Sequence, residues 1–499
     1  MENNNSPNNQ NQASPTNQNP AINQSPQNAI VGGIDIRDEN LNPNSQNPTG
    51  PQPPIGKTAP PFKAVNKSGF LKKILFVLIF ILLAGVIIFA LTRSKNPILD
   101  GGGNGNIVWW GMFLEENDVS GLVDEFQEQN PNVKITYVKQ SPTDYRERLA
   151  NALAAGNGPD IFEIHDSWPY MFLEELAVMP DSIYSTEEYN STFYPAIISD
   201  MTTNKGIIGI PLEYDALTLF INEDIFASGA KTPPKTWDEL RRLAEEFTQK
   251  GEEGKIIQAG VALGNTKNVD YWQDILGFML LQNGADPANP VDNKATDAVS
   301  YYTQFTNLGV WNSTLPNSTR AFALGKVAMY LGPSKSSTEI VKENPNLKYR
   351  TVNLPQLPKN KPTDVDVSYV SYWTEGVAEQ SKNKDAAWLF LKFLTTKESL
   401  AKLNQNYKQR TKSDRVSPRI DMSQLYINDK IVGSIVSLAS SAKSWYLADN
   451  TNDGPQGLNS QLGAIYADIL NIESGKYASP KDAAEDISKV LSQYDIPLD

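Results

Sequence analysis

The sequence contains no cysteine and only one histidine, His165. Without cysteine the chain forms no disulfide, no thiolate zinc site and no cysteine nucleophile, and a lipidated N-terminal cysteine is excluded as an anchor. A single histidine excludes metal sites that need two, and neither a Walker A nor a G-x-S-x-G motif is present. No cofactor is expected. A carboxylate pair of the kind used in glycoside hydrolysis stays open, with candidates among Glu115, Glu116, Asp166, Glu213 and Asp215.

The first part of the chain has almost no side chains that can build a core. Residues 1–69 are dominated by Asn, Gln, Pro and Ser, and their first aromatic residue is Phe62. Such a composition buries too little apolar surface to offset the entropy lost on ordering. We therefore expect residues 1–69 to be a disordered tail.

The run from Ile74 to Leu91 has no charged or strongly polar residue. About 18 apolar residues in a helix span most of a ~30 Å hydrocarbon layer. Only two basic residues follow closely, whereas five lysines precede the run: Lys57, Lys63, Lys67, Lys72 and Lys73. The positive-inside rule then predicts a transmembrane anchor over 70–93, with residues 1–69 cytoplasmic and the remainder outside the cell membrane. A cleaved signal peptide is the alternative, which the length of the run and of the preceding tail disfavours.

The formal net charge is −13, and all of the excess acidic residues lie after Lys95. An exterior domain this acidic is a poor partner for nucleic acid or an anionic lipid surface. Residues 94–105 are rich in Gly and Asn, which is typical of a short flexible linker. No strand precedes these glycines, so they do not match a dinucleotide-binding fingerprint.

From Asn106 onward, short β-rich runs alternate with amphipathic segments. The patterns predict strands over 106–110, 133–138 and 160–164. They predict helices over 118–129 and from Ser141-Pro142, as N-cap and first turn, to Ala155. This β-α-β-α-β order favours a mainly parallel sheet covered by helices on both faces. About 390 residues of such a pattern are more than a single hydrophobic core usually organises, so two lobes are expected.

Several ordered segments of this region resemble one protein family. Gly158–Phe162 resembles its "GPD-hydrophobic" strand entry, and Ile208–Pro211 with Asp215–Phe226 resembles its interlobe crossing and "YNKDLF"-like signature. Pro233–Leu240 resembles "PPKTWEEL", Phe322–Met329 resembles "F-x-x-GKAAM", and Ser381–Thr395 resembles its "sknk-x-x-AW-x-F-x-KFLT" segment. Together they resemble the extracellular solute-binding proteins of the maltose-binding type, over about residues 106–494.

The resemblance implies an α/β fold of the periplasmic-binding-protein type, with two mixed or parallel sheets, flanking helices and a hinge between two lobes. One lobe is expected at about 106–213 and 372–418, and the other at about 217–366 and 422–499. The implied function is capture of a sugar or oligosaccharide for an ATP-binding-cassette importer, by a monomer that closes on its ligand and contacts a membrane permease. In open α/β sheets, ligands bind outside the carboxyl ends of the strands, which agrees with this expectation.

Candidate ligand contacts are aromatic platforms and planar polar groups, because sugars present C–H faces and hydroxyl edges. Trp109 and Trp110 face opposite sides of a strand, and we expect Trp110 to reach the cleft with Phe113. The other residues that the resemblance and the pattern favour are Asp166, Ser167, Trp168, Tyr214, Asp215, Trp272, Ser334, Tyr372, Trp373, Trp445 and Tyr446. For each aromatic residue a place in the core is the alternative.

One departure from the family pattern concerns the ligand. Where the family has Gly-Pro-Trp, this chain has Gly332-Pro333-Ser334, and Lys335 follows. The missing stacking surface disfavours maltodextrin itself, and leaves a different sugar or one bearing an acidic group. An anchored sensory receptor with the same fold and a surface glycosidase remain alternative functions.

Overall fold

The computed structural model describes residues 105–286, 288–359, 361–445, 451, 453–455, 457–471 and 475–493. The expected tail and anchor helix, almost all of the expected linker, and Tyr446 lie outside these residues. Within the described ranges, no helix combines the length and apolar character that crossing a membrane requires.

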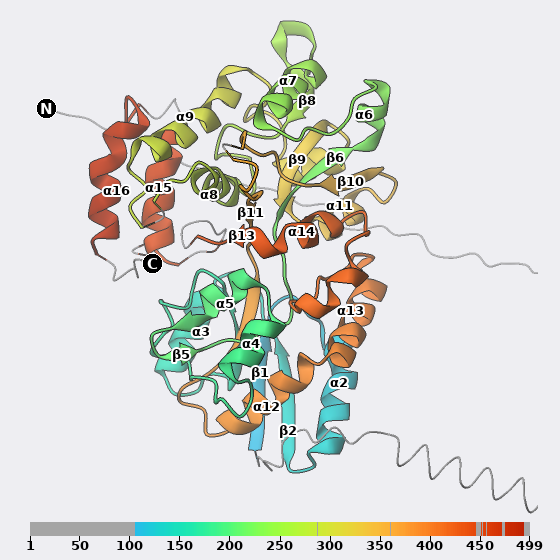
Figure 1. Cartoon of the computed structure of the whole chain (residues 1–499), viewed down its shortest axis with the longest axis vertical. Coiled ribbons are helices and arrows are strands. Elements are labelled where there is room, and N and C mark those ends of the chain that lie inside the picture. The colour runs from blue at the N-terminus through green and yellow to red at the C-terminus, as the bar shows by residue number, and fades with distance from the viewer. Residues whose placement is uncertain are drawn as a thin grey trace, which may run out of the picture. The chain divides into compact units, whose positions relative to one another are not determined.

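A four-stranded mixed sheet, in the order β12-β3-β1-β2, forms what we call the lower lobe (Figure 1). Three of its strands are parallel and one is antiparallel: β1 (Gly105–Gly111), β2 (Val133–Lys139) and β3 (Ile161–His165), with β12 (Trp373–Val377) pairing antiparallel to β3. The three strands expected from the sequence and their parallel pairing are confirmed. Trp109 is fully buried, whereas its neighbour Trp110 is half-buried on the opposite face.

Helices cover both faces of the lower sheet and bury two separate apolar clusters. One cluster lies under α2 (Glu116–Gln129), α4 (Thr186–Thr192), α5 (Pro195–Met201), α12 (Lys384–Leu394) and α13 (Lys397–Thr411), and the other under α3 (Tyr145–Ala154). The expected start of α3 at Ser141-Pro142 was wrong. The Ser141 hydroxyl accepts from the backbone N–H of Thr143 (3.2 Å) in a turn, and the helix begins after Asp144. Local side-chain bonds of this kind compete with a helix N-cap.

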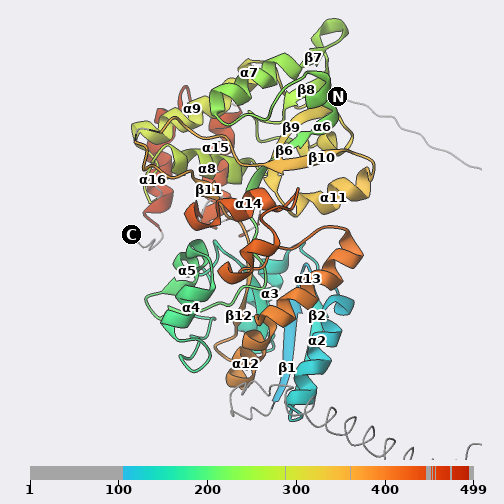
Figure 2. The same ribbon diagram turned by 45° about the vertical axis from the view of Figure 1, so that its right-hand side comes forward.

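A five-stranded mixed sheet, in the order β10-β6-β9-β8-β7, forms the upper lobe (Figures 1 and 2). Its strands are β6 (Leu217–Asn222), β7 (Gln249–Lys250), β8 (Ile256–Val261), β9 (Val327–Pro333) and β10 (Tyr349–Val352). Only the β8–β9 pair among them is parallel. Its helices are α6 (Glu223–Ser228), α7 (Trp237–Phe247), α8 (Trp272–Gln282), α9 (Asn293–Asn307), α10 (Ser318–Ala323), α11 (Ser336–Glu343), α15 (Leu458–Leu470) and α16 (Ala484–Leu491).

Helix α7 shows how the sequence sets an element of the upper lobe. The Thr236 hydroxyl accepts from the backbone N–H of Glu239 (3.2 Å), and the Glu239 carboxylate accepts from the backbone N–H of Thr236 (3.2 Å). This capping box satisfies two N–H groups that a helix start leaves without intrahelical partners. Trp237, Leu240 and Leu243 then recur on one buried face, which seats the helix on the sheet.

The remaining elements are short, and some of them lie within one lobe. They are β4 (Thr202–Thr203), β5 (Gly206–Ile207), β11 (Ser368–Tyr369), β13 (Ala442–Lys443), α14 (Gly433–Ser437) and the 3-10 helices η1 (Glu252–Gly254), η2 (Ile420–Leu425), η3 (Ala439–Ser441) and η5 (Pro480–Ala483). Helix α14 lies between the lobes in both ribbon views. Buried side chains from Met422 to Ala442 contribute to the lower core.

Candidate functional site

Three chain segments cross side by side between the two sheets. Ala216 bridges to Val370, β11 pairs in parallel with β13, and the backbone N–H of Val370 donates to the carbonyl of Lys443 (2.9 Å). On the lower side, Tyr214 bridges to Val416. A few backbone-paired crossings of this kind form a hinge about which two lobes can turn.

An aromatic cluster lies at the edge of the lower sheet where the parallel strands end. Phe113 follows β1, Trp168 follows β3, and Trp373 opens the antiparallel β12. The Trp373 ring lies 5.1 Å from Trp168 and 5.4 Å from Phe113, centroid to centroid. Tyr145, at the start of α3, stacks on Trp168 at 6.4 Å. Topology alone brings these four rings together, since they lie far apart in the sequence.

His165 and its neighbours form a polar group beside this cluster. Its Nδ1 contacts the Ser167 hydroxyl (2.9 Å), and its Nε2 contacts the Ser371 hydroxyl and Asp166 Oδ1 (both 3.1 Å). Asp166 Oδ1 also accepts from the backbone N–H of Tyr372 (3.0 Å). Burial, and secondarily the charge of Lys335, hold the pKa of His165 well below its usual range. His165 is therefore neutral at pH 7 and positions the loop that carries Asp166 and Trp168.

Asp215 ties the first crossing segment to the upper lobe. Its Oδ1 accepts from the hydroxyl (2.6 Å) and backbone N–H (2.9 Å) of Ser334, and its Oδ2 accepts from the backbone N–H of Lys335 (3.1 Å). The backbone N–H of Ala216 is a further donor to Oδ1 (2.9 Å). Burial raises the pKa of Asp215, which Lys335 partly opposes. Asp215 and Ser334, both expected at the site, thus lie together.

The remaining candidates have other surroundings. Trp272 and Trp445 are buried in the upper core, with the Trp445 ring 6.4 Å from that of Tyr466. Tyr214 and Tyr372 are buried in the lower core, where the Tyr372 hydroxyl donates to Asp200 Oδ2 (3.1 Å). Trp110 borders the cluster that contains Trp168 and Trp373. These rings are buried in a conformation in which the two lobes are in contact.

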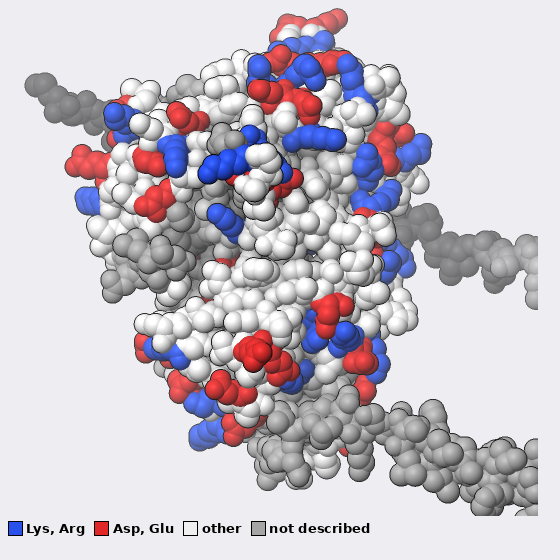
Figure 3. Space-filling model, in the orientation of Figure 1, with Lys and Arg blue, Asp and Glu red and all other residues white. Residues whose placement is uncertain are grey.

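Hydrogen bonds between side chains join the two lobes. The Trp168 indole N–H donates to the Thr451 hydroxyl (2.9 Å), and the Ser337 hydroxyl of α11 donates to that of Ser413 (3.0 Å). The Lys335 ammonium of the upper lobe also lies 5.5 Å from the ring centroid of Phe113 in the lower lobe. The side chains where the lobes meet are therefore mainly aromatic and neutral polar. In Figure 3, charged side chains gather toward the two ends of the face and are sparse across its middle.

No pattern in the sequence singled out Tyr145, Thr451 or Ser413 at this site, because only the tertiary fold brings them near. A buried charge group next to the hinge was also missed. Arg415 donates through Nε (2.9 Å) and Nη2 (2.7 Å) to Glu213 Oε2, and Glu163 lies opposite Glu375 in the β3–β12 pair.

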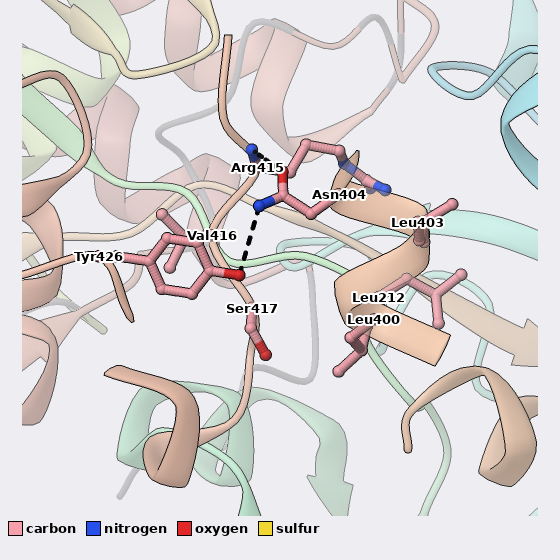
Figure 4. Close-up of a pocket in the computed structure, with 8 residues that line it drawn as sticks. All are labelled: Leu212, Leu400, Leu403, Asn404, Arg415, Val416, Ser417 and Tyr426. Carbon is pink, nitrogen blue, oxygen red and sulfur yellow. Dashed lines mark hydrogen bonds between the residues drawn. The ribbon is translucent and has the colours of Figure 1, made fainter. Parts of the chain in front are cut away.

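A small cavity under α13 does not coincide with the aromatic cluster (Figure 4). Its lining is largely apolar and comes from Leu212, Leu400, Leu403, Asn404, Arg415, Val416, Ser417 and Tyr426. The Asn404 amide accepts from the backbone N–H of Arg415 (2.8 Å) and donates to the Tyr426 hydroxyl (3.5 Å), so its polar groups serve the fold. The edge cluster is the better candidate, since it combines rings with polar groups from both lobes.

Other proteins are similar in sequence to this chain. A putative binding protein of Brucella abortus is 25% identical over 312 residues, which cover 59% of this chain and 71% of that protein. The maltotriose-binding protein of Pyrococcus abyssi is 23% identical, covering 60% of this chain and 64% of that protein.

Solved structures share the fold. An ABC-transporter solute-binding protein of Thermotoga lettingae, bound with α-D-tagatose, has a TM-score of 0.61 at 21% identity, covering 78% of this chain and 100% of that one. The sugar-binding protein MalE of Xanthomonas citri has a TM-score of 0.62 at 17% identity, covering 78% and 98%.

The family resemblance seen in the sequence is also confirmed by a family model. Residues 115–401, more than half of the chain, match the model described as bacterial extracellular solute-binding protein. Proteins of this family bind solutes and are not enzymes, which removes the carboxylate-pair alternative. The chain belongs to the bacterial extracellular solute-binding proteins.

Proposed function

We propose that this protein captures a sugar or oligosaccharide between its lobes and presents it to the permease of an ATP-binding-cassette importer. Similar proteins are described as binding maltotriose, tagatose and mannotriose. The observation that carries the proposal is the Phe113–Trp168–Trp373 cluster at the strand-end edge, with Asp166 beside it. Rings stack on sugar C–H faces, and a carboxylate accepts from hydroxyl groups.

The contacts between the lobes support a clamshell mechanism. Trp168 is 2% exposed and Trp373 8% exposed here. Separation of the lobes would uncover their outer edges. A ligand that contacts both lobes stabilises only the closed form, so binding shifts the population toward closure. A permease can then distinguish loaded from empty protein by shape.

Calorimetric titration of the purified full-length chain with a panel of neutral and acidic oligosaccharides tests the proposal. We expect one class to bind with 1:1 stoichiometry and to be recovered chemically unchanged. Amino acids and short peptides at the same concentrations serve as the control panel. Binding confined to that control panel would refute a sugar ligand.

We further propose that a helix over residues 70–93 tethers the binding domain to the outer face of the cell membrane, with residues 1–69 in the cytoplasm. The uncharged run and the preceding lysines support this. Protease added to intact cells or spheroplasts should digest the chain beyond Gly101 and spare the tail. Digestion of the tail from outside, or a mature chain that begins after Thr92, would contradict it.

A further inference from the structure

Lys335 projects from the upper lobe to the aromatic edge of the lower lobe. It follows β9 and directly precedes α11. Its Nζ lies 5.5 Å from the ring centroid of Phe113, which itself packs against Trp373 at 5.4 Å. The ammonium therefore stands inside the interlobe space that we propose to hold the ligand.

This ammonium lacks a polar partner. Among the residues that the structure describes, Nζ of Lys335 makes no hydrogen bond and no ion pair. Burial works against its charge, but Tyr271 and the carboxylates of Asp215 and Glu213 outweigh that effect, so the pKa of Lys335 is raised. Lys335 is half-buried, and its protonated amine has three donors for which the described side chains supply no acceptor, so a ligand in this space can supply one.

Three carboxylates raise the pKa of Lys335, those of Asp215, Glu213 and Asp274, and the first two are already engaged by other groups. Four donors from Ser334, Lys335 and Ala216 contact the Asp215 carboxylate. The Glu213 carboxylate accepts two hydrogen bonds from Arg415. The carboxylates of Asp215 and Glu213 therefore act on Lys335 only through longer-range electrostatics. A ligand group can then occupy the position of a direct ion-pair partner.

On the basis of the proposed function, we propose that the captured sugar carries an anionic group, and that this group pairs with the Lys335 ammonium while the sugar ring lies on Phe113 and Trp373. A uronate carboxylate, a sulfate ester and a phosphate ester share the required chemistry. An anionic acceptor compensates a desolvated ammonium better than a hydroxyl does, because both partners of the hydrogen bond are charged.

Titration of the full-length chain with four probes separates these sources. The probes are trigalacturonate, its fully methyl-esterified form, a 6-sulfated maltose and a 6-phosphorylated maltose. We expect one of the acidic probes to bind at least about tenfold more tightly than the neutral ester, with an affinity that falls as salt rises. The acidic probe that binds identifies the anion.

Two variants then test the role of Lys335. Lys335→Met keeps the apolar stem over Phe113. It should lower the affinity for the acidic probe about 10- to 100-fold and leave the affinity for the neutral ester unchanged. Lys335→Arg keeps the charge and should retain most of the affinity. Lys348→Met, at an exposed upper-lobe lysine, is the matched control and should change nothing.

The possible failures are distinguishable. If the wild type binds neutral sugars as tightly as their acidic counterparts, or if Lys335→Met binds the acidic probe like the wild type, the anionic ligand is refuted and the proposed sugar-capture function stands. If no glycan of either panel binds, the proposed function is refuted and this inference with it.

Discussion

The two lobes have similar α/β architectures but very different interiors. The upper core is built from aliphatic and aromatic side chains such as Phe220, Phe322 and Tyr330, which pack ring against ring. The lower lobe gathers buried ionisable groups of both signs beside its hinge, whereas the upper lobe buries aspartates such as Asp274 of α8. Glu163 and Glu375 are 3% and 2% exposed on adjacent strands, and Arg415 and Glu213 form an ion pair next to them.

This difference has an electrostatic consequence. Among the described residues, Glu375 Oε2 and Arg415 Nη1 are buried without a hydrogen-bond partner. Burial raises the pKa of Glu375 well above its usual range and that of Glu163 to about 7. The lower lobe is therefore expected to respond to pH and to loss of charge, whereas the upper core depends mainly on packing.

The largest expected effect is at the buried ion pair. Arg415→Met leaves Glu213 without its partner and removes the positive charge nearest Glu163 and Glu375. Breaking a buried pair in this way costs about 3–5 kcal/mol of unfolding free energy, measured by urea denaturation at pH 8. Arg320→Met, at an exposed upper-lobe pair, should cost no more than about 1 kcal/mol.

Removing the unpaired charge of Glu213 should recover much of the lost unfolding free energy. The double variant Arg415→Met with Glu213→Gln should be more stable than Arg415→Met alone. Equal losses for Arg415→Met and Arg320→Met would remove the contrast between the lobes.

The next effect concerns pH. The carboxyl of Glu163 binds its proton more tightly in the folded than in the unfolded state, because burial raises its pKa from 4.5 to about 7. Its contribution to stability is therefore fully present below about pH 4.5 and is lost as pH rises through 7. Glu163→Gln should stabilise the protein at pH 8 by on the order of 3 kcal/mol and leave it nearly unchanged at pH 4.5.

Unfolding free energies at both pH values check this prediction. Glu246→Gln, on the exposed face of α7, is the matched upper-lobe control and should leave the pH profile as in the wild type. A Glu163→Gln profile that parallels the wild type would show that the carboxyl does not titrate in this window.

Phe113 tests the aromatic edge of the lower lobe with a smaller effect. It is only half-buried, so Phe113→Ala should cost little folding stability. It should reduce affinity for the bound glycan by roughly 1–2 kcal/mol, about 5- to 30-fold, through lost apolar contact. Calorimetry measures this, with Ile257→Ala at an exposed upper-lobe position as control. Unchanged affinity would place the sugar elsewhere.

The smallest effect is at the contact between α11 and the segment after α13. Ser337→Ala removes the hydrogen bond to Ser413, worth about 0.5–1.5 kcal/mol to the closed form. Small-angle scattering without ligand should show a larger mean radius of gyration than the wild type. Ser228→Ala, on the exposed face of α6, provides the comparison. A scattering curve identical to that of the wild type would show that this bond does not hold the lobes together.

The sequence predicted most of the secondary structure, but only part of the site. Strand alternation is a local signal and is confirmed, and the Thr236 capping box that starts α7 is equally local in origin. The positions of Phe113, Asp166 and Trp168 followed from loops after predicted strands, since parallel strands end at one edge. A position in a helix or a loop does not show, however, whether an aromatic ring stacks on a ligand or packs in the core. Trp272 and Trp445 are buried in the upper core. Partners such as Tyr145, Thr451 and Arg415 depend on long-range packing that one sequence does not encode locally.

The bonds of Asp215 determine where the chain has to bend. Its carboxylate holds the backbone of Ser334 and Lys335 and so ties the side chain to the upper lobe, while its backbone carbonyl accepts from the N–H of Ser371 (3.2 Å). Tyr214 is paired with Val416 and moves with the lower lobe. Ala216 still packs in the lower core and Leu217 packs in the upper core, so in the first crossing segment the rotation that parts the lobes must be absorbed by the few residues from Tyr214 to Leu217. The hinge then lies at the base of the cleft between the lobes, so a small local rotation produces a wide opening at the cleft entrance.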